Sequence, residues 1–206
     1  MRSITYAATG PSDVLHLVER DIPEPGPGEV RVRVHVSGVN PTDWKRRAAQ
    51  TGPAELSEPV VPNQDGAGVV DAVGAGVTSL AISDRVWLYL AQHDSTEGTA
   101  QEFTVVSAHK AVPLPDSASF EVGASLGVPA MTAHRALTIH EDGPTRLAPG
   151  ALAGRTVLVT GGAGAVGHAA IQLARWAGAT VITTISSPEK AVLATAAGAH
   201  HAIDYT

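Results

Sequence analysis

Apolar and polar residues alternate along the first half of the chain with the period of a β-strand. From Val30 to Val36 a valine stands at every second position, and the positions between hold two arginines and a histidine. This segment is predicted to be a strand with one buried and one solvated face. Three shorter apolar runs, each flanked by glycine, serine or aspartate, predict further strands at residues 68–73, 84–90 and 101–106. The first part of the chain is therefore predicted to be a small antiparallel barrel or sandwich.

A helical period replaces this alternation near Ser119. Residues 120–139 are rich in alanine, leucine and valine, and they predict one or two buried helices with a break or a start at Pro129. A turn-rich linker follows over residues 140–154. The rest of the chain predicts strand, helix, strand, helix and strand in turn, at residues 157–159, 166–177, 180–185, 188–197 and 201–205.

The first of these later strands leads into a glycine-rich turn. Residues 157–159 form an apolar, largely β-branched run that is typical of a parallel strand buried on both faces. Gly162, Gly164 and Gly167 then form G-x-G-x-x-G. In dinucleotide folds these glycines supply, in order, a tight turn, a close backbone approach to a pyrophosphate, and close packing of helix on strand. The helix that follows offers its unpaired N–H groups to the anion.

The surroundings of this turn favour a nucleotide site over a glycine-rich turn that binds no ligand, because strand, helix and strand have the length of one βαβ unit. A Walker loop needs Lys followed by Ser or Thr after the last glycine, where this chain has His168 and Ala169. A short-chain dehydrogenase pattern needs glycine at position 165, where Ala165 stands. A methyltransferase would need an acidic residue near Thr160 or at the end of the second strand, and neither is present.

The end of the second strand indicates which dinucleotide would bind. An NAD site usually has Asp or Glu about 20 residues after the glycines, to bind the ribose 2′-hydroxyl. Ser186, Ser187 and Lys190 occupy this region instead. Two hydroxyls and an ammonium suit a 2′-phosphate, which favours NADPH over NADH. The alternative is structural: Ser186 or Ser187 caps a helix starting at Pro188, with Glu189 in a capping box and Lys190 solvated.

The doubly wound fold is only partly represented. Its strand order is 3-2-1-4-5-6, and the sequence supplies strands 1, 2 and 3. We therefore expect two domains, residues 1–120 and residues 121–206, the second being the first half of a nucleotide-binding domain. Either the sequence is a fragment, or another chain completes the sheet.

Composition excludes several classes of protein. The chain has 206 residues, 44% of them hydrophobic and 17% charged, which is ordinary for a globular protein. A net charge of −6 gives no basic footprint for nucleic acid. The absence of cysteine excludes disulfides and thiolate metal sites and fits a reducing cytoplasm. No 18-residue apolar run and no N-terminal apolar h-region occur, so we expect neither a membrane span nor secretion.

Several ordered motifs together resemble one known family. They lie at residues 38–43 (GVNPTD), 61–68 (VPNQDGAG), 98–103 (GTAQEF), 123–133 (GASLGVPAMTA), 162–167 (GAGAVG) and 172–174 (QLA). On these motifs the chain resembles the N-terminal two-thirds of zinc-independent medium-chain dehydrogenases/reductases of the quinone oxidoreductase (zeta-crystallin-like) group. The resemblance implies an α/β protein, with an N-terminal GroES-like β-barrel followed by a partial Rossmann doubly wound parallel sheet.

The resemblance also implies a site without metal. Zinc-dependent relatives place Cys and then His-Glu where this sequence has Asn40 and Gln64-Asp65, and they build a four-cysteine lobe that a chain without cysteine lacks. Two departures from the family pattern bear on the substrate pocket: Asn63 stands where glycine is usual, and Trp44 lies where relatives often carry tyrosine. The resemblance implies Asn40 and Thr132 beside the nicotinamide, Gly164, Ala165 and Val166 on the pyrophosphate, and Ser186, Lys190 and Tyr205 around the 2′-phosphate.

Each acidic or amide candidate also has a structural interpretation. Asn40 precedes Pro41 and is equally suited to cap a turn. Asp43 and Asp65 are expected to be capping or network carboxylates rather than proton donors.

The function expected from these observations is NADPH-dependent hydride transfer to a quinone or another conjugated carbonyl compound, without zinc. Enoyl-thioester reduction by the same family is the close alternative. A truncated or split chain that binds NADPH without turnover is the alternative of a different class. We expect a small-molecule substrate, no nucleic acid or membrane partner, a cytoplasmic location and, from the resemblance, a homodimer.

Overall fold

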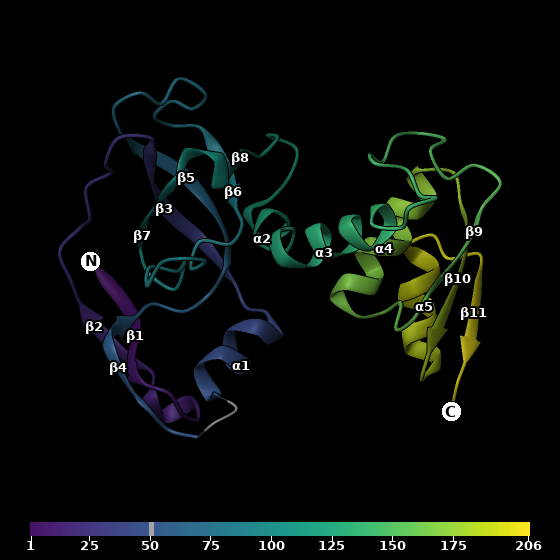
Figure 1. Ribbon diagram of the computed structural model, residues 1–206, viewed down its shortest axis with the longest axis horizontal. Helices are drawn as coiled ribbons and strands as arrows, with labels where there is room; N and C mark the ends of the chain where they lie inside the picture. Colours follow the sequence, from purple (N-terminus) through teal and green to yellow (C-terminus); the bar gives the residue numbers. More distant parts are fainter. Residues whose placement is uncertain (50–51) are drawn as a thin grey trace. The chain divides into compact units, whose positions relative to one another are not determined.

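The computed structural model describes residues 1–49 and 52–206, and it divides into two compact units, Met1–Val128 and Pro129–Thr206 (Figure 1). Unit 1 consists mainly of antiparallel strands. Its strands are β1 (Arg2–Ala8), β2 (His16–Glu19), β3 (Glu29–Gly38), β4 (Glu55–Val60), β5 (Asp65–Val73), β6 (Arg85–Leu88), β7 (Phe103–Ser107) and β8 (Ala111–Pro113). Its helices are η1 (Ser12–Val14), α1 (Pro41–Ala48), η2 (Ala108–Lys110) and α2 (Phe120–Ala124), and α3 (Gly127–Thr138) begins in it.

The larger sheet of unit 1 has the strand order β7-β3-β5-β6-β8. The predicted strand at residues 30–36 lies in β3, and Val30 and Val32 on its apolar face are fully buried. Strands β5, β6 and β7 confirm the strands that the three shorter apolar runs predicted. The core of this sheet contains Val30, Val32, Val70, Leu80, Val86, Leu88, Ala91, Val106 and Ala111.

The smaller sheet, with the order β2-β1-β4, was not located by the apolar pattern. In β1 the inward positions include Ser3 and Thr5, which are buried polar residues, so no hydrophobic alternation marks the strand. Helix α1 was missed for a similar reason, because Asp43 is its only buried residue. It is fixed instead by a capping box and by Pro41 in its first turn.

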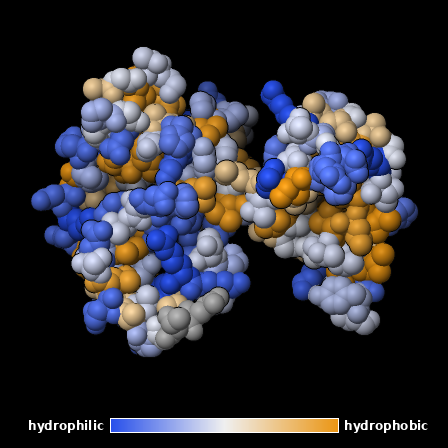
Figure 2. Space-filling view, in the orientation of Figure 1, coloured by the Kyte–Doolittle hydropathy of each residue, from blue (hydrophilic) through white to orange (hydrophobic). Residues whose placement is uncertain are grey.

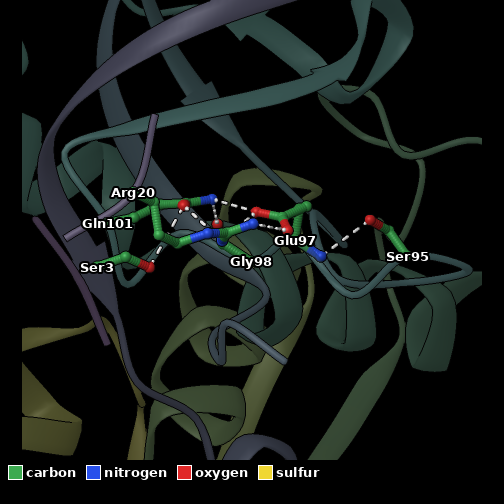
Figure 3. A network of polar contacts seen from close by, with 6 residues as sticks. All are labelled: Ser3, Arg20, Ser95, Glu97, Gly98 and Gln101. Carbon is green, nitrogen blue, oxygen red and sulfur yellow. Dashed lines mark hydrogen bonds and ion pairs between the residues drawn. The ribbon is translucent and has the colours of Figure 1, made fainter. Parts of the chain in front are cut away.

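A polar network joins the smaller sheet to the loop before β7 (Figure 3). Arg20, just after β2, donates to both carboxylate oxygens of Glu97 at 2.9 and 2.7 Å. Gln101 donates to Glu97 at 3.0 Å and to the Gly98 carbonyl at 3.1 Å. Ser3 in β1 pairs with Gln101 by a backbone bridge. Since each of these groups has its partner within the loop or the sheet, we assign the network to structure.

Helices α2 and α3 confirm the expectation of helical structure at residues 120–139. The break falls at Ser125 and Leu126, ahead of Pro129. Pro129 lies in the first turn of α3, where its missing N–H removes no helical hydrogen bond. The helices are less buried than the pattern indicated, since the side chain of Val122 is 49% exposed.

Unit 2 confirms the strand–helix alternation. It contains β9 (Thr156–Val159), α4 (Ala165–Trp176), β10 (Thr180–Ile185), α5 (Pro188–Ala196) and β11 (His201–Asp204), besides most of α3. The three strands are parallel, in the order β11-β10-β9. This is the 3-2-1 half of a doubly wound sheet.

The two faces of this parallel sheet differ. Helices α4 and α5 pack against β10 on the face where Val181 and Thr183 are fully buried. On the other face Leu158 is 61% and Ile203 50% exposed. The expectation that residues 157–159 are buried on both faces is therefore wrong for Leu158, because helices of the described chain cover one face only. Apolar atoms are visible on the surface of this unit in Figure 2.

In the part of the chain that the structure describes, no helix combines the length and apolar character needed to cross a bilayer.

The packing of unit 1 yields a stability prediction. Leu88 in β6 is fully buried, whereas Leu17 in β2 is 67% exposed. Leu88→Ala is expected to lower the free energy of unfolding by about 2–5 kcal/mol, because it removes buried methyl groups and leaves a cavity. Leu17→Ala is the matched control, with an expected change below about 0.5 kcal/mol. Urea unfolding followed by tryptophan fluorescence measures both, and equal losses would contradict the assigned core.

Candidate functional site

The glycine-rich turn connects β9 to α4 as the sequence indicated. Gly161 has φ of 67°, so the left-handed residue of the turn is Gly161 rather than Gly162. Gly164 is the N-cap of α4, which begins at Ala165. The first N–H groups of this helix, those of Ala165 and Val166 among them, have no partner within the helix and carry the positive end of its dipole.

The three motif glycines have different surroundings. A Cβ on Gly162 would overlap the Thr183 hydroxyl of the neighbouring strand, and one on Gly167 would overlap the Gly161 carbonyl. These two positions allow close packing of strand and helix on the turn. A Cβ on Gly164 would meet only the Gly161 carbonyl, at 3.3 Å. Gly164 thus leaves its outer side open, which is the condition for a ligand to approach the backbone.

A cavity of about 270 Å³ opens beside this turn. It is lined by residues from the turn, from the end of β10, from the start of α5 and from the segment just after β11. The lining residues are Gly161, Ala163, Gly164, Thr184, Ile185, Ser186, Lys190 and Tyr205. Four of them, Gly164, Ser186, Lys190 and Tyr205, were identified from the sequence as cofactor contacts. This lining contains one cationic side chain and no carboxylate.

Ser186 and Ser187 have separate positions. The Lys190 ammonium donates to Ser186 Oγ at 2.7 Å, which holds an ammonium and a hydroxyl together on the cavity wall. Ser187 is outside the lining and is the N-cap of α5, accepting from the Lys190 N–H at 3.4 Å. The structural alternative therefore applies to Ser187, while Ser186 and Lys190 face the cavity.

Sequence reasoning missed Thr184 in this wall. Its hydroxyl accepts from the Gly161 N–H at 3.0 Å, and its carbonyl accepts from the Gly162 N–H at 3.1 Å. Thr184 thereby ties the turn to β10. The available signal was its position near the carboxyl end of a parallel strand, where ligands of such sheets bind.

Unit 1 contains a second group of predicted residues, around Asn40. Asn40 is the N-cap of α1 and is 7% exposed. It forms a capping box with Asp43, whose Oδ2 accepts from the Asn40 N–H at 2.6 Å. Asp43 Oδ1 accepts from the Gln64 N–H at 3.2 Å. The structural interpretation of Asn40 and Asp43 as capping residues thus has direct geometric support.

Asp65 lies beneath this cap and is fully buried. Its Oδ2 accepts from Asn40 Nδ2 and from the Val128 N–H, both at 2.7 Å. Its Oδ1 is buried without a hydrogen-bond partner among the described residues. A Cβ on Gly127 would overlap this carboxylate, so glycine at the start of α3 allows the approach.

Both carboxyl groups have raised pKa values. Burial raises the pKa of Asp65 to about 6, against the opposing hydrogen bonds from Val128 and Asn40, and the charge of Asp43 raises it further. Burial also raises the pKa of Asp43, opposed by the hydrogen bonds from the Asn40 and Gln64 N–H groups.

Thr132, the other residue predicted beside the nicotinamide, lies exposed in the middle of α3. Of the two departures from the family pattern, Asn63 has φ of 80° and donates to Ser37 Oγ at 2.9 Å. Trp44 is 50% exposed on α1. Among residues 1–49 and 52–206, no cluster of three or more His, Cys, Asp or Glu side chains is arranged to hold a metal ion.

Comparison with known proteins gives matches in both units. The model of the alcohol dehydrogenase GroES-like domain matches residues 26–116, and that of the zinc-binding dehydrogenase matches residues 165–206. The quinone oxidoreductases of Rattus norvegicus and Pseudomonas aeruginosa are 35% and 36% identical over the whole chain. A 2-methylene-furan-3-one reductase of Solanum lycopersicum is 32% identical, and the chain covers 52% of it.

Solved structures give the same result. Escherichia coli quinone oxidoreductase in complex with NADPH is 29% identical, with a TM-score of 0.80 over the whole chain. A mycobacterial protein solved with NADPH is 35% identical, with a TM-score of 0.81. The chain spans 59% of the length of each of these structures and of the two quinone oxidoreductases above.

Burial of Asp65 predicts a specific pH dependence of stability. Because the folded pKa of about 6 exceeds the unfolded value near 3.8, the folded chain retains a proton between these pH values that the unfolded chain releases. This stabilisation is complete below the lower value and is lost as the pH rises through 6. Asp65→Asn removes the titration, so between pH 3.5 and 7 its free energy of unfolding should rise relative to the unmodified chain by about 3 kcal/mol.

Denaturant unfolding at a series of pH values measures this difference. Thr104→Val, which changes a fully buried hydroxyl that has no hydrogen-bond partner in the described chain, is the control and should shift stability equally at every pH. A pH-independent difference for Asp65→Asn would contradict the raised pKa.

Proposed function

The chain belongs to the quinone oxidoreductase group of the medium-chain dehydrogenases/reductases, and from this membership we propose that it forms part of an NADPH-dependent oxidoreductase that reduces quinones or other conjugated carbonyl compounds. The observation that carries the proposal is the cavity beside the glycine turn. The wall of this cavity contains the open side of Gly164 and the hydrogen-bonded pair of Ser186 and Lys190.

The charge of this wall favours NADPH over NADH. A 2′-phosphate is dianionic or nearly so, and an ammonium paired with a hydroxyl offers it charge-assisted hydrogen bonds. A carboxylate at the same place would repel the phosphate and favour the free ribose hydroxyl. Relatives solved with NADPH support this assignment.

Each part of the site has a proposed task. The N–H groups of Ala165 and Val166 would hold the pyrophosphate at the start of α4, with Gly162, Gly164 and Gly167 giving it access. Tyr205 would border the adenosine beside Ser186 and Lys190. Asn40 and Thr132 are proposed to lie against the nicotinamide and the substrate. When bound, NADPH supplies the hydride, and a proton from water completes the reduction.

The proposed substrate is a polarised conjugated system. A quinone or an enone accepts a hydride without a metal when polar groups position it against the nicotinamide. The similar reductase that acts on a methylene-furanone supports enones as candidates. Chemistry without zinc is proposed because Asn40 and Gln64 replace the usual ligands and the chain has no cysteine. A homodimeric, cytoplasmic enzyme is proposed on the family resemblance and on this lack of cysteine.

Turnover tests the proposal directly. NADPH consumption should be saturable with a benzoquinone or an enone and unaffected by removal of divalent metal with a chelator. Faster consumption with an enoyl thioester would favour the alternative substrate. Tight NADPH binding without consumption in any of these assays would favour a binding protein without turnover.

Cofactor selectivity predicts the effect of one substitution. Lys190→Ala removes the cation of the cavity wall and is expected to raise the Kd for NADPH about tenfold, equivalent to about 1.4 kcal/mol, while the Kd for NADH changes less than about twofold. Lys110→Ala, at a half-buried lysine of unit 1 that donates to a backbone carbonyl, is the control. Fluorescence titration with both cofactors measures the effect, and equal weakening of NADPH and NADH would contradict the phosphate contact.

A further inference from the structure

The buried carboxylate of Asp65 has contacts that capping alone does not require. Helix α1 is already capped by Asn40 and Asp43. Asp65 lies in β5, more than twenty positions after Asn40 in the sequence. Its Oδ2 accepts a hydrogen bond from Asn40 Nδ2 at 2.7 Å. We propose that Asp65 is a positioning residue of the reductase, which fixes the amide of Asn40 and the start of α3. This inference rests on the proposed function. It names the residue that holds a proposed contact residue of the site, Asn40, in place.

The hydrogen bond to Asp65 sets the orientation of the Asn40 amide. An asparagine side chain can rotate so that its oxygen and nitrogen exchange places, and the two orientations offer a ligand different groups. The Asp65 carboxylate oxygen accepts a hydrogen bond, so the nitrogen of Asn40 must face it. The capping box turns the Asn40 side-chain oxygen toward the start of α1, where the Asp43 N–H donates to the Asn40 backbone carbonyl at 3.0 Å. The second N–H and the oxygen of the amide then remain, in fixed directions, for a cofactor or substrate.

The Asp65 carboxylate also binds the backbone at the start of α3. The same Oδ2 atom accepts the Val128 N–H in the first turn of this helix, also at 2.7 Å. Helix α3 carries Thr132, the second proposed contact of the nicotinamide. A single carboxylate oxygen thus accepts hydrogen bonds from the Asn40 side chain and from the backbone at the start of α3. Glycine at position 127 permits the arrangement, since a Cβ there would overlap the carboxylate.

Burial of the Asp65 carboxylate is energetically costly. A fully buried carboxylate without a cation in contact destabilises a fold, and an apolar residue of similar size would be more favourable for stability alone. The charged and titratable groups around Asp65 offset little of the free-energy cost of burying its carboxylate. Asp43 is of like charge, and Arg46 acts on Asp43. Oδ1 has no hydrogen-bond partner among the described residues. Such costs are typical of groups retained for a site's geometry.

A double-mutant cycle on the enzyme tests the inference. Asn40→Ala and Asp65→Ala should each lower kcat with a quinone by roughly tenfold to a hundredfold, because loss of positioning by about 1 Å has effects of this size. The double variant should be no slower than the slower single variant, since Asp65 acts through Asn40. Asp65→Asn keeps an acceptor oxygen and should restore kcat to within about threefold of the unmodified enzyme. If the kcat of the double variant fell by the product of the two single losses, the proposal would be overturned.

A second readout does not depend on turnover. In ¹⁵N-labelled protein, the side-chain NH₂ signals of Asn40, assigned by their loss in Asn40→Ala, should shift in Asp65→Asn and stay in place in Thr104→Val. Unchanged signals in Asp65→Asn would overturn the proposal whatever the activity. If the unmodified protein consumes no NADPH with any acceptor, the proposed function fails, and these signals alone decide the positioning role.

Discussion

Around the start of α1, unit 1 is arranged under one constraint, which is that the buried carboxylate of Asp65 must be hydrogen-bonded. Its partners come from the loop before α1 and from the first turn of α3, so two segments far apart in the sequence converge on it. The constraint extends to residues without polar side chains. A Cβ on Gly127 would overlap the carboxylate, and one on Gly38 would overlap the Ala124 carbonyl. Glycines at these positions are therefore a consequence of the buried charge and of the close backbone packing around it.

In unit 2 the constraint is close packing of the backbone, where unit 1 has a buried carboxylate. Gly162 and Gly167 let a strand, a turn and a helix pack more closely than side chains would permit, while Gly164 leaves the turn open on its outer side. Thr184 fixes the turn to β10 by two hydrogen bonds. The resulting cavity is lined by Gly164, the N-cap of α4, and by Lys190. The nearby helix N-terminus and this cation both favour an anionic ligand.

The sequence was most informative where structure follows local chemistry. Glycine spacing and helical periodicity located β9, α4, β10, α5 and β11, and alternation located β3. It was least informative where tertiary partners replace apolar patterning, as in β1 with its buried Ser3 and Thr5, and in the polar helix α1. The raised pKa of Asp65 depends on burial among residues distant in sequence, so no local pattern marks it. Ser187 was ambiguous because a helix cap and a phosphate contact need the same hydroxyl, and only the direction of its side chain separates them.

The glycine turn and the cavity wall with Ser186 and Lys190 are proposed to form a site selective for NADPH. Calorimetric titration of the unmodified 206-residue chain with NADPH and, in parallel, with NADH tests it most directly. We expect saturable binding of NADPH at one site and binding of NADH weaker by about tenfold or more. Equal affinity for the two cofactors, or binding of neither, would contradict it.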